Sequence, residues 1–380
     1  MPRSPRALIE PRLLTWFREH AHLMVEDIAR VAAVTPAMVA AWEAGTSQPT
    51  IRQLRLIARK VRRPLAAFFL SEPPAGFSLP HDYRVVYGSD ATIDEDLVRA
   101  VDEAHERREA ALALLEDLGD NPPAFGAAMD GGQSPEELGE RLRDVLSVTE
   151  ADEAGWHKAE EALDAWRLAA EHLGVLVFQA GSLPGSVRGF SLSFDVLPAI
   201  VLNRKDAVVA RSFTLAHELA HLVLHGDGIC DPLRAPIESS PGAETEVYCN
   251  HVAGAVLVPA LALRNKLPDR LPSDREIEGL ARRFQTSCEV IVRRLTILGV
   301  VDDEFYQRKR AEYEAARATR TTHKGGRIPM SVDVLSKVGR PFARLVLTAY
   351  RAGAVSSTDA AAHLGARLKH FPAIEAALAR

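Results

Sequence analysis

The sequence predicts an α+β protein that is mostly helical, with one small sheet in the middle of the chain. Three observations lead to this fold class. Apolar residues recur at spacings of three and four along most of the chain, which is the periodicity of amphipathic helices. After Gly174 the pattern changes to three short, β-branched or alternating segments, which indicates a three-stranded sheet. The length of 380 residues exceeds what one hydrophobic core usually organises, so several domains are expected.

Composition favours a cytoplasmic protein. Hydrophobic residues make up 47% and charged residues 26%, and no apolar run approaches the roughly 18 to 20 residues that span a bilayer. Arg12, Arg18 and Glu19 interrupt the N-terminal segment, which therefore lacks the apolar stretch of a signal peptide. The three cysteines have no CxxC spacing, which argues against a disulfide framework. We expect no membrane partner.

The net charge of −5 is unevenly distributed. Residues 1–70 hold 11 Lys and Arg against 5 Asp and Glu, so this segment carries +6 and the remainder of the chain −11. A basic N-terminal end is suited to nucleic acid.

Residues 1–72 are expected to form a domain of five short helices. Thr35 and Pro36 have the residue types of a helix N-cap and first helical position, and Pro49-Thr50 opens the next helix. The segment resembles the lambda-repressor-type (XRE) helix-turn-helix family. The resemblance implies that the helix starting near Thr35 enters the major groove of double-stranded DNA.

The exposed-looking positions of that helix depart from the family pattern. Apart from Thr35, the candidate contact residues are Ala37, Met38 and Ala41, whose side chains cannot make the bidentate hydrogen bonds that discriminate bases. The next helix upstream begins at Leu23-Met24-Val25, where a polar cap is expected. Two interpretations therefore stay open, a domain that binds DNA and a domain that docks a protein.

Residues 73–168 are expected to form a linker and a helical spacer. The Pro- and Gly-rich segment 71–84 breaks the helical pattern, and residues 93–118 read as a long helix with Glu and Arg on its polar face. Ser134 and Glu137 have the spacing of a capping box. Helices follow in LGERLRDVL and HKAEEALDAWRLAAEHLG.

Residues 169–268 contain the predicted sheet, in VLVFQAG, SVRGFSLSF and LPAIVLN, followed at once by the helix RSFTLAHELAHLVLHG. On a helix, residues four apart lie on the same face, so His217 and His221 can present their imidazoles to one ion, with Glu218 beside them. Catalytic Zn²⁺ sites use three protein ligands and one open position, so a third ligand must come from elsewhere.

Four residues are candidates for that third ligand: His225, Asp227, Glu246 and Cys249. His225 would lie about 12 Å along a continuous helix from His217, which favours a supporting role for it at the helix C-terminus. Glu246 begins a second helical stretch and can fold back across the first, so it is the preferred ligand. The spacing of Cys249 from Glu246 suggests core packing.

The segments GFSLSFDVLPAIVLN, RSFTLAHELAHLVLH and ETEVYCNHVAGAVLVP together resemble the ImmA/IrrE family of metallopeptidases (M78, formerly DUF955) over roughly residues 170–265. The resemblance implies a zincin-like peptidase core in which His217, His221 and Glu246 bind the metal and Glu218 is the catalytic base. Cys249 replaces the usual Ala of the family. Asn250 matches the family's Asn and is expected to hydrogen-bond around the ligands.

This resemblance implies metal-assisted peptide hydrolysis with Zn²⁺, although Mn²⁺ or another divalent ion fits the same ligand set. Arg211 and Tyr248 are near enough in sequence to be considered as groups that stabilise the oxyanion. Salt bridging and packing are alternative roles for both.

Residues 269–325 are expected to form a helical subdomain with a helix-turn-helix-like rhythm, and residues 326–380 a compact helical tail with breaks at Gly339, Gly353 and Gly365.

Two classes of function are consistent with the sequence. The first is an endopeptidase that cleaves a specific protein, for which the resemblance suggests a DNA-binding repressor of a mobile element or stress response. The second is a transcription regulator or antitoxin-like protein whose metal domain senses or docks. The expected partners are a protein substrate, double-stranded DNA through residues 1–72, and a second copy of the chain.

Overall fold

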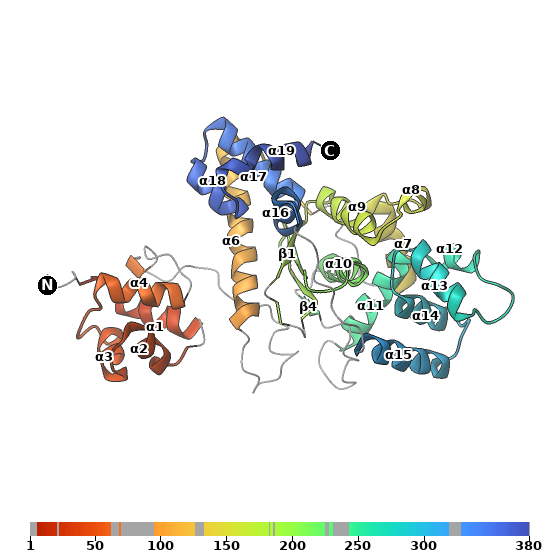
Figure 1. Cartoon of the computed structure of the whole chain (residues 1–380), viewed down its shortest axis with the longest axis horizontal. Coiled ribbons are helices and arrows are strands. Elements are labelled where there is room, and N and C mark those ends of the chain that lie inside the picture. The colour runs from red at the N-terminus through yellow and green to blue at the C-terminus, as the bar shows by residue number, and fades with distance from the viewer. Residues whose placement is uncertain are drawn as a thin grey trace. The chain divides into compact units, whose positions relative to one another are not determined.

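The computed structural model describes residues 6–20, 23–61, 68–69, 95–125, 133–181, 183–184, 187–224, 228–230, 243–318 and 328–379. The chain divides into two compact units, residues 1–79 with 92–99 and residues 80–91 with 100–380 (Figure 1). Among the described residues, no helix combines the length and the apolar character needed to cross a membrane.

The N-terminal unit is a small helical domain. Its four described helices are α1 (Pro11–His20), α2 (Val25–Ala32), α3 (Pro36–Glu43) and α4 (Ile51–Lys60). They enclose a core that includes Phe17, Ile28, Trp42 and Leu54, all almost fully buried. Most of the fifth helix that the sequence predicts lies outside the described residues, apart from a short 3₁₀ turn at residues 68–69.

Local hydrogen bonds explain where these helices begin. The Thr35 hydroxyl accepts a hydrogen bond from the Met38 N–H at 3.3 Å, and Pro36 opens α3 as expected. Helix α2 lacks a polar residue at its N-cap, as the sequence indicates, but the Met24 N–H donates to the Asp27 carboxylate at 3.1 Å. The cap is therefore supplied from inside the helix.

Four described helices lie between α4 and the sheet in the chain: α6 (Glu95–Leu118), α7 (Pro135–Leu146), α8 (Glu150–Gly155) and α9 (Ala159–His172). Helix α6 matches the long helix predicted over residues 93–118. The predicted capping box at the start of α7 is present, because the Ser134 N–H donates to the Glu137 carboxylate at 2.9 Å and the Glu137 N–H donates to the Ser134 hydroxyl at 3.3 Å.

The three predicted strands are present as β1 (Leu176–Ala180), β2 (Gly189–Leu192) and β3 (Ala199–Asn203). A fourth, short strand that the sequence analysis did not predict, β4 (Gly228–Cys230), extends the sheet. The strand order is β1-β3-β2-β4. Strands β1 and β3 are parallel, whereas β2 is antiparallel to both of its neighbours.

Both faces of the sheet are covered, which explains why its strands read as continuous apolar runs. Successive residues of a strand point to opposite faces. Val177 joins the core formed with helix α10 (Val208–Val223). Its neighbour Phe178 packs against Phe342 on helix α17 (Arg340–Ala352), with the two ring centroids 6.0 Å apart. The Arg107 guanidinium on α6 lies over the same Phe178 ring at 5.4 Å.

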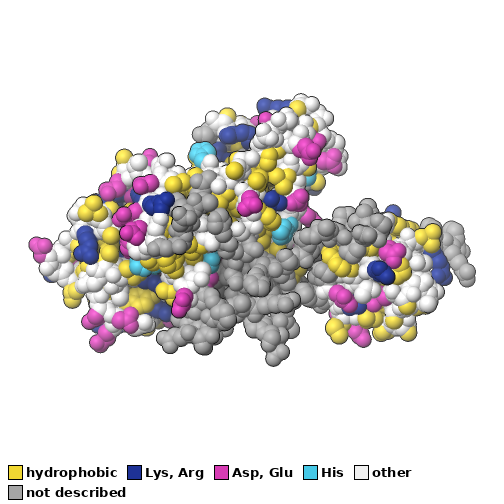
Figure 2. All heavy atoms as spheres, turned by 180° about the vertical axis from the view of Figure 1, so that it is seen from behind, with side chains coloured by type: hydrophobic (Ala, Val, Ile, Leu, Met, Phe, Trp, Pro, Cys, Tyr) yellow, Lys and Arg dark blue, Asp and Glu magenta, His cyan; other side chains and the backbone are white. Residues whose placement is uncertain are grey.

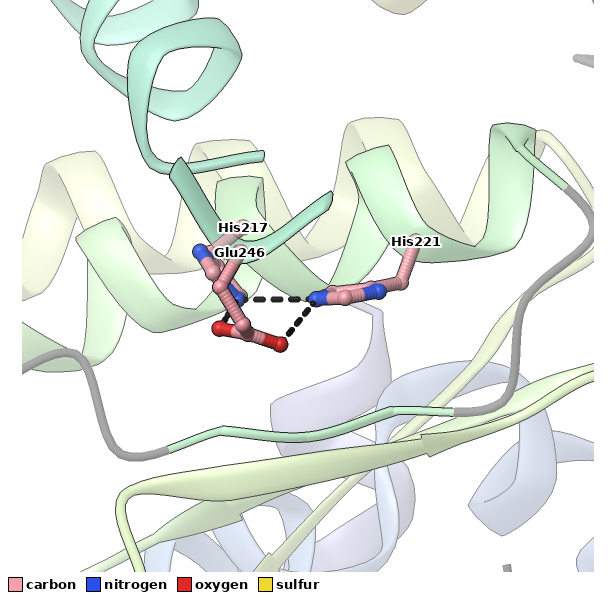
Figure 3. Close-up of side chains that lie close together, drawn as sticks. All are labelled: His217, His221 and Glu246. Atoms are coloured by element: carbon pink, nitrogen blue, oxygen red, sulfur yellow. Dashed lines mark hydrogen bonds and ion pairs between the residues drawn. The ribbon is translucent and has the colours of Figure 1, made fainter. Parts of the chain in front are cut away.

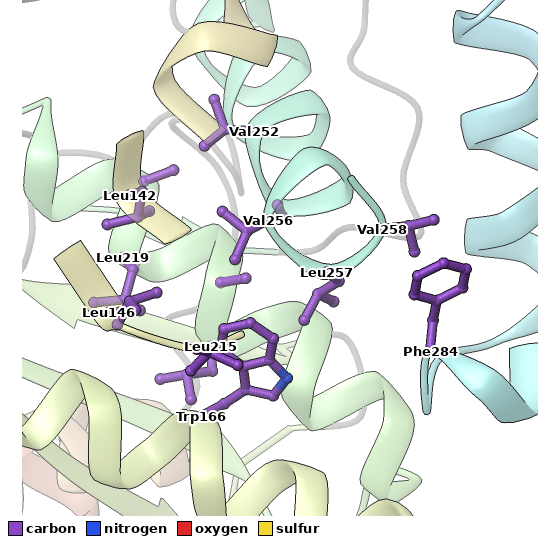
Figure 4. Close-up of a cluster of buried hydrophobic side chains, with 14 of the residues drawn as sticks. Leu142, Leu146, Trp166, Leu215, Leu219, Val252, Val256, Leu257, Val258 and Phe284 are labelled. Carbon is purple, nitrogen blue, oxygen red and sulfur yellow. The ribbon is translucent and has the colours of Figure 1, made fainter. Parts of the chain in front are cut away.

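One hydrophobic core unites most of the larger unit (Figure 4). It draws residues from α7, α9, α10 and the sheet, and from the helices α11 (Ala243–Leu257), α12 (Ala260–Arg264), α13 (Asp274–Arg283) and α14 (Cys288–Ile297), with Tyr313 of α15 (Asp303–Ala318) packed against it. The domain borders predicted at residues 168 and 268 fall inside this core, so the core does not mark either border. Both borders stay predictions. Helices α7 and α11 pack closely at Gly139, where an added Cβ would lie 2.4 Å from the Ala255 side chain.

The C-terminal tail is helical, as expected, with α16 (Met330–Val338), α17, α18 (Ser357–Leu364), a 3₁₀ turn η2 (Leu368–His370) and α19 (Phe371–Leu378). Helices α16, α17 and α18 end at the predicted glycines, which have φ angles of 80°, 76° and 60°. An ion pair between Arg204 and Asp333 at 2.6 Å ties α16 to the loop after β3.

A buried carboxyl group lies where this tail meets α9. Burial raises the pKa of Glu171 to about 7, and the positive charges of Arg167 and Arg340 only partly oppose this effect. The Arg167 and Glu171 side chains are 3.8 Å apart, and Gly339 packs against the same carboxyl group. Glu171 therefore costs folding free energy when it is ionised.

This site predicts a pH-dependent stability. The unfolded chain releases the Glu171 proton near pH 4.5, whereas the folded chain holds it to about pH 7, so the free energy of unfolding falls as the pH rises between these values. The effect is on the order of 3 kcal/mol. Between pH 5 and pH 8, the free energy of unfolding measured with urea should fall less in Glu171→Gln than in the wild type. Parallel losses in the two proteins would contradict this account.

Candidate metal centre

Helix α10 carries two histidines whose side chains converge. His217 and His221 lie one turn apart on the same face of the helix, and both are buried. Their Nε2 atoms are 3.0 Å apart (Figure 3). Leu215, Leu219 and Leu222 pack the rest of the helix into the core, which fixes the direction of the two imidazoles.

Glu246 reaches this pair from the first turn of α11. Its Oε2 atom lies 3.4 Å from the His217 Nε2 atom, and its Oε1 atom lies 3.1 Å from the His221 Nε2 atom (Figure 3). The packing of α11 against α10 brings the carboxylate across, as the sequence analysis expected. His217, His221 and Glu246 thus form a cluster in which one donor atom from each lies within 4.8 Å of the others.

The spacing of the three donors fits one small cation. Two nitrogen atoms and one carboxylate oxygen are the donors that Zn²⁺ takes in catalytic sites. Donors bound at about 2.0–2.1 Å to one tetrahedral ion lie roughly 3.3 Å from each other. The two nitrogen atoms here are 3.0 Å apart, and each lies near a different oxygen of the Glu246 carboxylate, at 3.4 Å for His217 and 3.1 Å for His221. The three side chains are therefore close enough to bind such an ion after small shifts.

The three groups differ in their proton affinity. Burial lowers the pKa of His217. Burial also acts to lower the pKa of His221, but the Cys249 thiol and the Glu246 carboxylate outweigh it and hold that pKa well above its ordinary value. Burial acts to raise the pKa of Glu246, whereas hydrogen bonds from both imidazoles lower it further than burial raises it. A cation that binds here would displace a proton, so metal affinity should fall as the pH falls.

Glu218 is fully buried beside these donors, on the side of α10 that faces the sheet. Its charge contributes to the raised pKa of His221. A Cβ added to Gly189 of β2 would lie 3.8 Å from the Glu218 carboxylate and 2.6 Å from the Thr214 methyl group. Gly189, which was not predicted as a site residue, lets the helix lie this close to the strand. Its only signal in the sequence is a glycine inside a strand pattern.

Two residues of α11 flank the histidines. Asn250, which is 5% exposed, lies one turn after Glu246 and acts to raise the pKa of His217 against the effect of burial. The Cys249 thiol lies beside His221, and burial raises its pKa. A thiol that keeps its proton is a poor metal ligand, which favours the packing role for Cys249.

The other candidates for the third ligand, His225 and Asp227, lie outside the described residues. Helix α10 ends at Val223, two residues earlier than the sequence analysis expected. The supporting role expected for His225 therefore stays a prediction.

The residues considered for stabilising an oxyanion have other contacts. The Arg211 guanidinium donates to the Gln179 side chain on β1. The Tyr248 hydroxyl donates to the Gln133 carbonyl at 2.8 Å. Neither contact directs the side chain toward the three metal-binding candidates, so both residues fit the structural roles named as alternatives.

One ionic cluster near the site was not predicted from the sequence. The Glu136 carboxylate at the start of α7 receives two hydrogen bonds from Arg294 of α14 and contacts the His251 Nε2 atom on α11 at 2.7 Å. Arg294 is 1% exposed and also donates to the Val258 carbonyl at 3.0 Å. The cluster joins the helix that carries Glu246 to two neighbouring helices.

In the N-terminal unit, α3 exposes the residues considered for partner binding. Thr35, Ala37 and Met38 are exposed and Ala41 is half-buried. Met24, just before α2, is also exposed. The face of this unit drawn in Figure 2 combines hydrophobic side chains with basic and acidic ones. Arg3, Arg62 and Arg63, which belong to the basic excess of this segment, lie outside the described residues.

Comparison with known proteins links this part of the chain to metallopeptidases. Residues 170–296 match the family model Peptidase_M78, described as the IrrE N-terminal-like domain. The matched region contains the sheet strands β1 to β4, both helices of the histidine and glutamate cluster, and α13 and α14. It extends beyond residue 268, where the sequence analysis ended the peptidase core.

A curated relative agrees with this match. The chain is 27% identical over 198 residues to the radiation response metalloprotease IrrE of Deinococcus radiodurans. The alignment covers 46% of this chain and 59% of the relative. Both comparisons support a metallopeptidase.

Proposed function

We propose that this protein is a metal-dependent endopeptidase, with His217, His221 and Glu246 as the metal ligands and Glu218 as the general base. The observation that carries the proposal is the convergence of the first three side chains at donor distances of 3.0 to 3.4 Å. The match of residues 170–296 to a peptidase family supports it.

The proposed mechanism assigns a task to each residue. When bound in this site, a divalent ion would supply Lewis acidity toward the scissile carbonyl and the attacking water. His217, His221 and Glu246 hold that ion, and Asn250 orients His217. Glu218 accepts a proton from the attacking water and passes it to the leaving amine, which completes hydrolysis of the peptide bond.

Zn²⁺ is the proposed resident ion, because two imidazoles and one carboxylate are a common donor set for it. Mn²⁺ and other divalent ions bind the same donors, and availability in the cell decides among them as well as geometry. Elemental analysis of the purified protein identifies the ion.

The ligand assignment predicts a loss of metal in two variants. His221→Ala and Glu246→Ala each remove one of three donors, so metal affinity should fall by more than the roughly 10–100-fold that loss of an outer-shell partner costs. Competition with a chelating dye measures this change. Glu244→Ala is the matched control, because Glu244 lies exposed in the same turn of α11. Unchanged metal affinity in Glu246→Ala would exclude Glu246 as a metal ligand.

We propose a DNA-binding repressor as the substrate, with control of a mobile element or a stress response as the outcome, inside the cytoplasm. The support is a radiation response metalloprotease among the relatives, of whose length the alignment covers 59%. The N-terminal unit would recruit this substrate. Its exposed Met24 and Met38, in a domain without charged residues on the outer face of α3, suit a protein contact better than base recognition.

The second candidate function is a DNA-binding transcription regulator or antitoxin-like protein. The contact between α2 and α3 across a three-residue connection favours it, because this arrangement suits entry of α3 into a major groove. A homodimer would suit a palindromic operator.

One experiment separates the two functions. Metal-loaded protein is incubated with candidate repressors encoded nearby, and binding to their operator DNA is measured in parallel. The peptidase proposal expects cleavage of one repressor and none with Glu218→Gln. Tight operator binding without cleavage in either protein would favour the regulator.

A further inference from the structure

A recess adjoins the histidine and glutamate cluster, between α10, α11 and α14. Its volume is about 280 Å³. Its walls are mostly apolar and include Ala210, Phe213, Gly254, Val290 and Ile297.

The recess and the candidate metal centre share a wall. Asn250 lines the recess and also acts on His217. Phe213, four residues before His217 on α10, lines the recess with a ring centroid 6.5 Å from that of the imidazole. A peptide whose carbonyl lies at the proposed metal would therefore have a neighbouring side chain within reach of the recess.

The size of the recess restricts what it holds. Sites for whole small molecules have volumes of roughly 300–1,000 Å³. A recess of about 280 Å³ is at the lower limit of that range, which suits one large side chain and part of a neighbouring one. Its apolar walls favour an apolar side chain.

The charges around the recess are unequal. Three arginines and one glutamate line it: Arg188, Arg293, Arg294 and Glu289. Arg188 pairs with Asp206, and Arg294 pairs with Glu136. Arg293 is half-buried and forms no ion pair with any residue that the structure describes. Its guanidinium is thus available for a carboxylate of a bound ligand.

We propose that this recess is the specificity pocket of the peptidase and accepts a large apolar side chain next to the scissile bond, with Arg293 selecting an acidic residue beside it. The inference rests on the proposed peptidase function, and it names the substrate class as a peptide segment that pairs Leu, Met or Phe with Asp or Glu.

A binding measurement tests the pocket without turnover. Zinc-loaded full-length Glu218→Gln is titrated with short blocked peptides that contain 4-fluorophenylalanine followed by Asp, and binding is followed by fluorine NMR. Replacing the aromatic residue by Ala, or Asp by Lys, should weaken binding on the order of tenfold or more. Equal affinity of all three peptides would overturn the proposal.

Variants then locate the contact. Ala210→Trp and Ile297→Trp each place a large ring in the recess. Ile297 is 38% exposed, so a larger side chain at this position should be tolerated and the variant should fold. Both should abolish the preference for the aromatic peptide. Arg293→Glu should reverse the preference from Asp to Lys. Ala154→Trp and Arg282→Glu are the matched controls, because both residues are exposed away from the recess.

Cleavage of a peptide library by the zinc-loaded wild type separates this inference from the function it rests on. We expect cleavage sites enriched in a large apolar residue at one flanking position, with an acidic residue adjacent. Selective binding without cleavage of any peptide would refute the peptidase and leave the pocket assigned. Cleavage with a preference that Ala210→Trp and Ile297→Trp both leave unchanged would refute the pocket and leave the peptidase.

Discussion

Glu218→Gln is expected to reduce peptide hydrolysis on the order of 10²–10⁴-fold while the protein keeps its metal, because general acid–base catalysis contributes about that factor. Glutamine preserves the size of the side chain but cannot accept the proton of the attacking water. The three proposed ligands are unchanged, so metal affinity should stay close to that of the wild type.

The measurement needs rate and metal content from the same preparation. Repressor cleavage is followed under single-turnover conditions, and bound metal is determined by elemental analysis. Glu244→Gln makes the same chemical change at an exposed position of α11 and should cleave normally. A Glu218→Gln protein that holds its metal and cleaves at the rate of the wild type would exclude Glu218 as the base.

The features that the sequence predicted correctly depend on short-range chemistry. Thr35 and Pro36 mark the start of α3, and Ser134 and Glu137 mark the start of α7, because capping bonds join residues three apart. The pairing of His217 with His221 follows from the pitch of one helix. Glu246 lies in the first turn of the following helix, and the structure brings its carboxylate to both histidines; its role as a metal ligand stays a proposal.

The features that the sequence did not predict depend on contacts between distant segments. The apolar patterns located three strands but could not give the order β1-β3-β2-β4 or the short β4. Glu136 and Arg294 are 158 residues apart, and each by itself resembles an ordinary surface charge. The recess lined by Ala210 and Arg293 likewise forms only when α10 and α14 pack together. The periodicity of apolar residues in the sequence does not indicate which distant residues pair.

The cluster of Glu136, Arg294 and His251 predicts a large loss of stability when its carboxylate is removed. Glu136→Ala leaves the Arg294 guanidinium, which is 1% exposed, without its counter-ion. Removal of one partner from a fully buried pair costs about 3–5 kcal/mol. The Glu136 side chain is 29% exposed, so we expect a smaller loss of about 2–3 kcal/mol from urea unfolding. Glu140→Ala, on the exposed face of the same helix, is the control.

The pH dependence of this cluster has the opposite sign to that of Glu171. Burial acts to raise the pKa of Glu136, but hydrogen bonds from His251 and Arg294 lower it to about 2. The unfolded chain binds this proton near pH 4.5, so the stabilisation is complete above that pH and is lost as the pH falls toward 2. The difference in stability between the wild type and Glu136→Ala should therefore shrink in acid.

A double variant distinguishes an unpaired buried charge from a general loss of packing. In Glu136→Ala with Arg294→Met, no buried cation remains, so the combined loss should be smaller than the sum of the two single losses. Because His251 lies five residues after Glu246 on α11, release of Glu136 should also let the proposed ligand move, and metal affinity should fall roughly 10–100-fold. Additive losses with unchanged metal binding would show that the cluster neither pairs a buried charge nor positions the metal-binding helix.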